Sequence, residues 1–125
     1  MVETRWDGGH RELEVWRCAV ELSTRAYQLT GKLPASERSG LTSQIRRAAA
    51  SVPANIAEGS GRLYPKEYVR HISIARGSLM ELDAHLAVAV NAGLLASTDA
   101  APAIQLIDRI GRMLTRLATV VARRS

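Results

Sequence analysis

Three histidines and one cysteine are the side chains of this 125-residue chain with the widest catalytic range, so their spacing is considered first. Glu67 lies four positions before His71, and Glu81 lies four positions before His85. Di-iron sites in helical bundles use Glu and His three positions apart, together with glutamates from facing helices. A spacing of four within one helix favours intrahelical Glu–His pairs instead. We therefore expect neither a metal site nor a cofactor.

The single cysteine, Cys18, cannot form a disulfide within the chain, and no histidine stands in helical register with it to act as a base. We interpret it as a small buried residue in a reducing compartment and expect a cytoplasmic protein. The glycines at positions 59, 61 and 77 do not follow strands, so neither of the two segments that contain them is a phosphate-binding loop. The sequence therefore predicts that the protein is not an enzyme.

Two stripes of residues share one long expected helix between Leu41 and Arg62. Both repeat in steps of three and four, the period of one helical face. The apolar stripe comprises Leu41, Ile45, Ala48, Val52 and Ile56. The polar stripe comprises Gln44, Arg47, Ser51, Asn55 and Glu58.

Ser and Asn are poor choices for a solvated helical face, because their side chains compete with the backbone for hydrogen bonds. The polar stripe therefore predicts a seam against the following helix, where Ser78 and Glu81 stand in suitable register. We assign Arg47 to the inner side with Glu81 as its partner, since a buried arginine needs a carboxylate. The alternative is a surface stripe exposed to water.

The formal charge is +5, from 17 basic and 12 acidic residues, and the excess lies in residues 34–63 and 96–125. Arginine outnumbers lysine, and its planar fork suits bidentate contacts to phosphate. We therefore expect an outward surface that contacts nucleic-acid phosphates, with a soluble basic surface as the alternative. The candidates are Arg46, Arg62, Arg109, Arg112 and Arg116.

Helical periodicity covers nearly the whole chain and predicts four helices with short loops. Ser36 or Ser39 should cap the second helix, and Ser97 with Asp99 should cap the fourth. Gly77 in the third helix suggests close backbone approach. The helices begin near Arg11, Leu41, Pro65 and Ser97, and the first and third end near Thr30 and Asn91.

Each expected helix has one apolar seam, which predicts an all-α fold, an antiparallel up-down-up-down four-helix bundle. Trp16 and Tyr27 should add buried area beside the first seam. The second helix should kink at Pro53, because proline removes one backbone hydrogen bond. The bundle domain should span residues 11–125 after a loose arm at 1–10. No apolar run is long enough to cross a membrane.

Residues of three motifs, in the first, second and third expected helices and the loop before the second, together match one known family pattern. The matching residues are Val15, Trp16, Ala19, Leu22, Leu33, Pro34, Glu37, Gly40, Leu41, Gln44, Ile45, Arg46, Arg47, Ala48, Ser51, Pro53, Asn55, Ile56, Ala57, Glu58, Gly59, Ala75, Gly77, Ser78, Leu79, Glu81 and Leu82. On these residues the chain resembles the family named four helix bundle protein or 23S rRNA-intervening sequence protein, over almost its whole length. It departs from the family pattern at Val52, where isoleucine is frequent, and in the absence of phenylalanine.

The resemblance implies a bacterial protein whose relatives are encoded within intervening sequences of ribosomal RNA genes. It also implies a homopentamer, and the wide apolar faces favour self-association through helix one or helix three. Distant relatives among retroelement accessory proteins are basic bundles that bind nucleic acid. Two functions follow as hypotheses: a ring-forming protein that binds RNA or DNA, or an oligomeric assembly module that holds a partner protein without nucleic acid.

Overall fold

The structure of the chain is a computed structural model that describes residues 10–124. Four α-helices and one short 3-10 helix make up this part of the chain, which contains no strand. The predicted N-terminal arm lies outside the described residues except for His10, where the first helix begins. In chain order the elements are α1 (His10–Thr30), η2 (Ala35–Glu37), α2 (Leu41–Ser60), α3 (Pro65–Asn91) and α4 (Ser97–Ala122).

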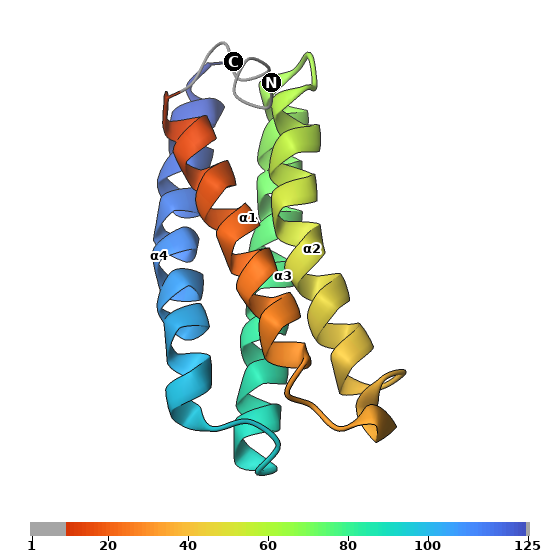
Figure 1. Cartoon of the computed structure of the whole chain (residues 1–125). Coiled ribbons are helices and arrows are strands. Elements are labelled where there is room, and N and C mark those ends of the chain that lie inside the picture. The colour runs from red at the N-terminus through yellow and green to blue at the C-terminus, as the bar shows by residue number, and fades with distance from the viewer. Residues whose placement is uncertain (1–9, 125) are drawn as a thin grey trace.

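The four helices lie side by side along one long axis (Figure 1). α1 and α3 each pack against both α2 and α4, so each helix has two principal neighbours and α2 lies diagonally opposite α4. The connections after α1 and α3 lie at one end of the bundle, and the connection after α2 lies at the other end (Figure 1). Side chains on α2 and α4 therefore belong to different faces of the molecule.

The predicted apolar seams form the core. The second-helix stripe is buried except for Leu41, which is half-buried. Cys18 is buried and free, as predicted. Tyr27 is 46% exposed, so it adds less buried area than expected. The other seams are buried at Val15, Ala19, Leu22, Ala26 and Leu29 in α1, at Tyr68, Ile72, Ala75, Leu79, Leu82, Leu86 and Ala89 in α3, and at Ile107, Ile110, Leu114, Leu117 and Val121 in α4.

The predicted helix caps are wrong. The residue before α2 is Gly40, and no side chain at that position closes the helix. The carboxylate of Glu37 instead accepts a hydrogen bond from the Leu41 backbone N–H at 3.2 Å. At the other cap, Ser97 already lies inside α4, and Asp99 forms an ion pair with Lys32 at 3.7 Å. The 3-10 turn explains the first difference, because it places Glu37 rather than a serine beside the free N–H groups.

The close backbone approach predicted at Gly77 occurs elsewhere. A Cβ atom added to Gly77 would meet no atom of the described residues within 4 Å. A Cβ atom at Gly59 would lie 2.8 Å from both His71 Cβ and Tyr68 Cδ1, so here α2 and α3 are in contact without room for a side chain. α2 continues through Pro53 as one helix. Among the described residues, none of the helices is sufficiently long and apolar to span a bilayer.

Candidate functional site

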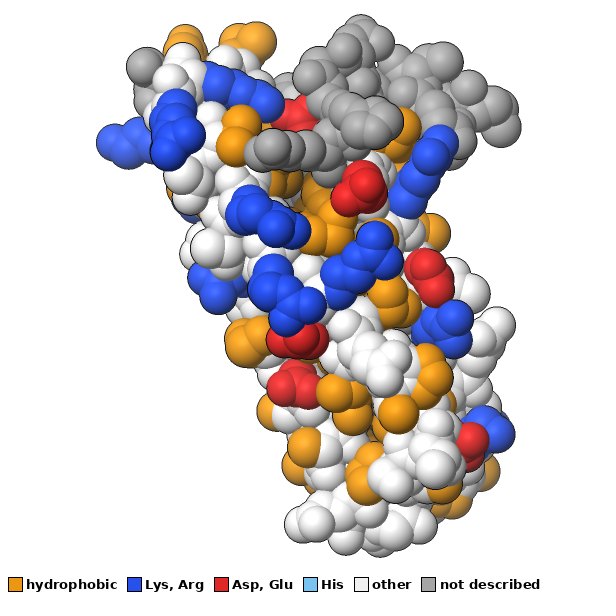
Figure 2. Space-filling model, turned by 90° about the vertical axis from the view of Figure 1, so that its left-hand side faces the viewer, with side chains coloured by type: hydrophobic (Ala, Val, Ile, Leu, Met, Phe, Trp, Pro, Cys, Tyr) orange, Lys and Arg blue, Asp and Glu red, His pale blue; other side chains and the backbone are white. Residues whose placement is uncertain are grey.

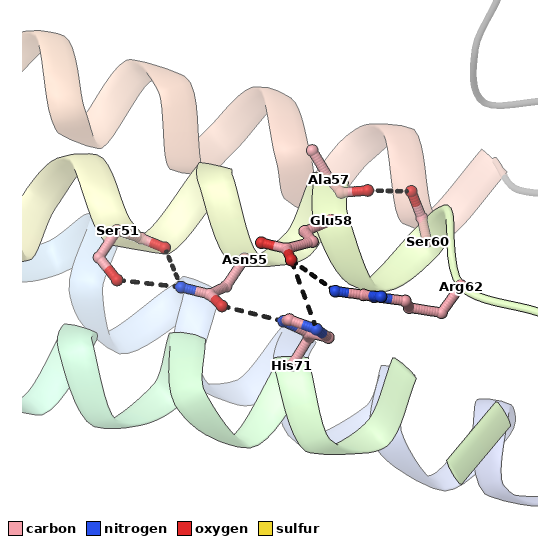
Figure 3. Close-up of polar contacts among 7 residues, drawn as sticks. All are labelled: Ser51, Asn55, Ala57, Glu58, Ser60, Arg62 and His71. Carbon is pink, nitrogen blue, oxygen red and sulfur yellow. Dashed lines mark hydrogen bonds and ion pairs between the residues drawn. The ribbon is translucent and has the colours of Figure 1, made fainter. Parts of the chain in front are cut away.

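A hydrogen-bonded network joins α2 to α3 midway along the bundle, and we name Ser51, Asn55, His71 and Ser78 the α2–α3 network. The Asn55 side-chain amide donates to the Ser51 hydroxyl at 3.0 Å and to the Ser51 carbonyl at 2.9 Å. The Ser78 hydroxyl donates to the Ser51 hydroxyl at 2.8 Å. The Asn55 carbonyl oxygen lies 3.0 Å from His71 Nδ1. Figure 3 shows the first three of these residues facing one another across the two helices.

The network fixes the tautomer of His71. A side-chain carbonyl oxygen can only accept a hydrogen bond, so His71 Nδ1 carries the proton that it donates to Asn55. The other ring nitrogen, Nε2, is buried and has no hydrogen-bond partner within residues 10–124. It lies 3.9 Å from a carboxylate oxygen of Glu58, which also pairs with Arg62 at 2.6 Å (Figure 3). The network therefore ends in a buried imidazole that faces a half-exposed carboxylate.

The predicted polar seam is thus present in its central part only. Ser51, Asn55 and Ser78 meet as expected, and neither Ser51 nor Asn55 is fully solvated. Glu58 contacts His71 at the margin of the network. Two further seam residues, Gln44 and Glu81, are exposed and lie outside these contacts.

The assignment of Arg47 to the inner side, paired with Glu81, is wrong. Arg47 is exposed, and within residues 10–124 it forms no ion pair with Glu81. At about 100° per residue, the eight positions between Arg47 and Asn55 turn the side chain by about 80° away from Asn55. That rotation carries Arg47 away from the apolar stripe and into solvent.

Arg46, which we expected to point outward, is the half-buried arginine of the pair. Its guanidinium carbon lies 4.7 Å from the centroid of the Tyr27 ring in α1. Its Nε atom donates to the Thr30 hydroxyl at 2.9 Å, and that hydroxyl donates to the Tyr27 carbonyl at 2.8 Å. Arg46 therefore binds α2 to α1 rather than joining an outward surface.

His71 is the network residue that the sequence interpretation missed. We expected it to pair with Glu67 in its own helix, but its contacts are to Asn55 and Glu58 of α2. The available signal was its position seven residues before Ser78, which puts both side chains on the same face of a helix. The sequence thus showed two polar residues of α3, His71 and Ser78, on the helical face that could meet the polar stripe of α2.

The remaining phosphate candidates divide between two faces. We name Arg109, Arg112 and Arg116 the α4 arginine surface, because all three are exposed on one helix at spacings of three and four. Arg112 pairs with Asp108 one turn earlier. Arg62, which follows the C-terminal end of the diagonally opposed α2, pairs with Glu58 and lies apart from that surface. Figure 2 shows lysine and arginine side chains gathered over one half of the side on which α4 lies.

Most of the chain, with all or most of each of the four helices, matches the model of one protein family. A family model described as 23S rRNA-intervening sequence protein matches residues 11–116. The chain belongs to this family. The resemblance seen in the sequence motifs is therefore confirmed, and the matched region includes the α2–α3 network and the α4 arginine surface. A search of curated proteins gave no match.

Two buried titratable groups in this family member are held in their neutral forms. Burial raises the pKa of the Cys18 thiol above its ordinary value, with the nearby Arg109 opposing the effect. Burial also raises the pKa of the Tyr68 phenol, whose hydroxyl has no partner among the described residues. A protonated thiol is a poor nucleophile. Across residues 10–124, no three His, Cys, Asp or Glu side chains are grouped closely enough to hold a metal ion.

Proposed function

We propose that this member of the 23S rRNA-intervening sequence protein family is a non-enzymatic binding protein that assembles with copies of itself and associates with RNA or DNA. The observation that carries the proposal is the α4 arginine surface. Arg109, Arg112 and Arg116 are exposed along one helix, and the only acid paired with them in the described chain is Asp108. A row of exposed arginines attracts phosphates regardless of sequence.

The proposed assembly is a homo-oligomeric ring, with five copies by resemblance to the family. Its support is a set of exposed apolar side chains on α3, at Ile74, Met80 and Val88, which are 40%, 50% and 55% exposed. Ile104 of α4, 38% exposed, lies near Met80 in a shallow groove between the two helices. Large exposed apolar side chains are typical of protein contacts when they gather on one element, and these favour helix three as the contact surface. A ring would repeat the arginine surface and strengthen weak phosphate contacts.

The proposed protomer is an antiparallel up-down-up-down bundle with a kink in α2. The positions of the three main connections at alternating ends support the antiparallel order (Figure 1). Pro53 inside α2 supports the kink, since its ring crowds the carbonyl four residues earlier.

Binding of labelled single-stranded RNA and duplex DNA, followed by fluorescence anisotropy over a salt series, tests the nucleic-acid part. The wild type should bind without strong sequence preference, and affinity should fall steeply as salt rises. Replacing Arg109, Arg112 and Arg116 with glutamine should weaken binding by about tenfold or more and flatten the salt dependence.

A matched variant keeps the same total charge change on other helices, with Arg47, Lys66 and Arg70 replaced by glutamine. All three are exposed on α2 or α3. This control should retain most of the affinity. If it loses as much as the α4 variant, the attraction is a general effect of net charge and the α4 surface is not the site.

The alternative function is an assembly module that holds a partner protein without nucleic acid. The internal pairing of several arginines favours it, since Arg46 packs on Tyr27, Arg62 pairs with Glu58 and Arg112 pairs with Asp108. If the wild type ignores RNA and DNA at low salt, and light scattering still gives an oligomer, this alternative replaces the nucleic-acid proposal. A monomer mass at micromolar concentration would contradict the assembly that both proposals share.

A further inference from the structure

The turn between α1 and α2 contains a groove of about 400 Å³, which we name the turn groove. Its basic and hydroxyl-bearing residues are Arg38 in the loop, Thr30 at the end of α1, and Thr42 with Arg46 in the first turns of α2. Two arginines and two hydroxyl groups thus converge on one concave surface. The groove lies at the end of the bundle that also holds the α3–α4 connection (Figure 1).

Arg46 is held in place before any ligand arrives. Its guanidinium lies over the Tyr27 ring, and its Nε atom donates to Thr30, which is itself buried. These contacts use the ring-facing surface and one N–H group, so the two terminal nitrogens still have donors to offer. A guanidinium that is already immobilised loses less side-chain entropy when it binds a planar or tetrahedral oxyanion.

The charge of the two arginines is not neutralised within the described chain. Arg25, Arg62 and Arg112 each pair with an acid four residues earlier in the chain. Residues 10–124 contain no such ion pair for Arg38 or Arg46.

Two acids near the α1–α2 connection have other partners. Glu37 accepts from the Leu41 N–H, and Asp99 pairs with Lys32. The turn groove therefore combines positive charge, free donors and no paired carboxylate.

We propose that the turn groove binds the phosphate monoester group of a phosphorylated ligand. A phosphate monoester carries nearly two negative charges at neutral pH, which two arginines would balance, and its oxygens accept bidentate bonds from guanidinium. The Thr42 hydroxyl supplies a further donor. The groove is larger than a bare phosphate requires and has room for part of an organic group. This site is separate from the α4 arginine surface and does not depend on it.

Isothermal titration of the full chain at low salt, with inorganic phosphate and with adenosine monophosphate as probes, tests the proposal. Both probes should bind, and adenosine without phosphate should not. Arg38→Gln should weaken binding of both probes by about tenfold or more, since each guanidinium contributes a charge-assisted contact. Arg46→Gln should weaken it at least as much. Because Arg46 also packs on Tyr27, the exposed Arg38 provides the variant that leaves the fold intact.

Arg47→Gln is the matched control, because Arg47 is the next residue along α2, carries the same charge and does not line the groove. It should leave the affinity for both probes within about twofold, as expected for a surface change outside the site. The proposal is overturned if the wild type binds neither probe, or if Arg47→Gln weakens binding as much as Arg38→Gln.

A pair of oligonucleotides of one sequence, with and without a 5′-phosphate, identifies the source of the phosphate. Tighter binding of the phosphorylated strand that Arg38→Gln abolishes would support the end of a nucleic-acid strand. Equal binding of the two strands, with adenosine monophosphate still bound in the groove, would support a small phosphorylated molecule. The Arg109, Arg112 and Arg116 variant should leave binding of adenosine monophosphate unchanged, which separates this proposal from the one above.

Discussion

The α2–α3 network and the α4 arginine surface both begin as polar residues repeated along a helix, yet the bundle uses them differently. In the network, Ser51 and Asn55 bond to one another and to residues of α3. On the α4 surface, Arg112 forms an ion pair with Asp108 in its own helix. The cause is side-chain length. Short polar side chains stay near their backbone and must find partners in the adjacent helix, whereas arginine reaches water from almost any position.

This difference predicts where free energy is sensitive to change. A buried polar group that loses its partner costs about 1–3 kcal/mol, because it was removed from water and receives nothing in return. An exposed pair four residues apart contributes about 0.3–0.5 kcal/mol. Changes in the network should therefore alter the free energy of unfolding, and changes on the α4 surface should alter binding alone.

The largest effect is expected from Asn55→Leu. This replacement leaves His71 Nδ1 and the Ser51–Ser78 pair without the amide that connects them. With the buried His71 and the half-buried Ser51 both affected, the free energy of unfolding should fall by about 2–3 kcal/mol. Urea denaturation followed by circular dichroism measures it.

Gln28→Leu is the control for that change, because Gln28 is an exposed residue of α1. Its effect should stay within about 0.5 kcal/mol. Equal destabilisation by the two replacements would show that the network is not a special determinant of stability.

The second effect concerns two glycines that differ only in their surroundings. Gly59→Ala places a Cβ atom 2.8 Å from His71 and Tyr68, so α2 and α3 must separate at one end of the network. Overpacking outweighs the gain in helix propensity, and a net loss of about 1–2 kcal/mol is expected. Gly77→Ala meets no atom of the described residues within 4 Å and should instead stabilise the protein by up to about 1 kcal/mol. Thermal unfolding of both variants in parallel checks the opposite signs.

The third effect depends on pH and involves Tyr68, which packs beside Gly59. Its pKa in the folded protein is raised above the ordinary value of 10.0, mainly by burial and further by Glu12, while Arg124 opposes the shift. A raised folded pKa means that its contribution to stability is complete below pH 10 and is lost as the pH rises further, because the unfolded chain ionises first. Tyr68→Phe removes this loss.

Compared with the wild type, Tyr68→Phe should be as stable or slightly more stable at pH 7, since the phenol hydroxyl is buried with no hydrogen-bond partner in the described part of the chain. The variant's advantage should grow by about 1 kcal/mol at one pH unit above 10. The comparison of two proteins at each pH cancels the alkaline titration of Cys18 and of the surface residues. A constant difference from pH 7 to pH 11 would contradict the assignment.

The helices could be predicted from the sequence because their signals are redundant. In α3, an N-terminal proline, a regular apolar seam and a terminal Asn-Ala-Gly all agree, and the predicted bounds Pro65 and Asn91 are those observed. The central part of the α2–α3 network could be predicted for a similar reason. Ser51 and Asn55 repeat at helical spacing beside an apolar stripe, and Ser78 stands at a matching position of the next helix. A surface exposed to water would not require this pattern.

The details that failed depend on a single local choice each. Arg46 and Arg47 are adjacent, and only the Tyr27 ring and Thr30 hydroxyl of another helix decide which of them packs inward. The space beside a glycine depends on how the neighbouring helix packs, and the sequence does not show this packing. Gly59 and Gly77 therefore look alike in the sequence. The hydrogen bond from the Leu41 N–H to Glu37 depends on the short 3-10 helix that precedes α2. Three residues are too few to show a periodic pattern in the sequence, so this contact could not be predicted.

The smallest effect on stability, and the sharpest test of the α4 surface, comes from Asp108→Asn. Both members of the Asp108–Arg112 pair are more than half exposed, at 69% and 66% of their side chains. Removing the carboxylate should therefore change the free energy of unfolding by less than about 0.5 kcal/mol. It also releases Arg112 and removes one negative charge from the surface. If that surface contacts phosphates, RNA should be retained to higher salt than with the wild type, because an additional cation can displace a counterion. Glu81→Gln on α3 makes the same charge change at an exposed position outside the groove that Asp108 lines, and it serves as the reference. Anisotropy titrations that cannot distinguish the two variants would show that the α4 arginines are a solvated surface and that phosphate binding lies elsewhere.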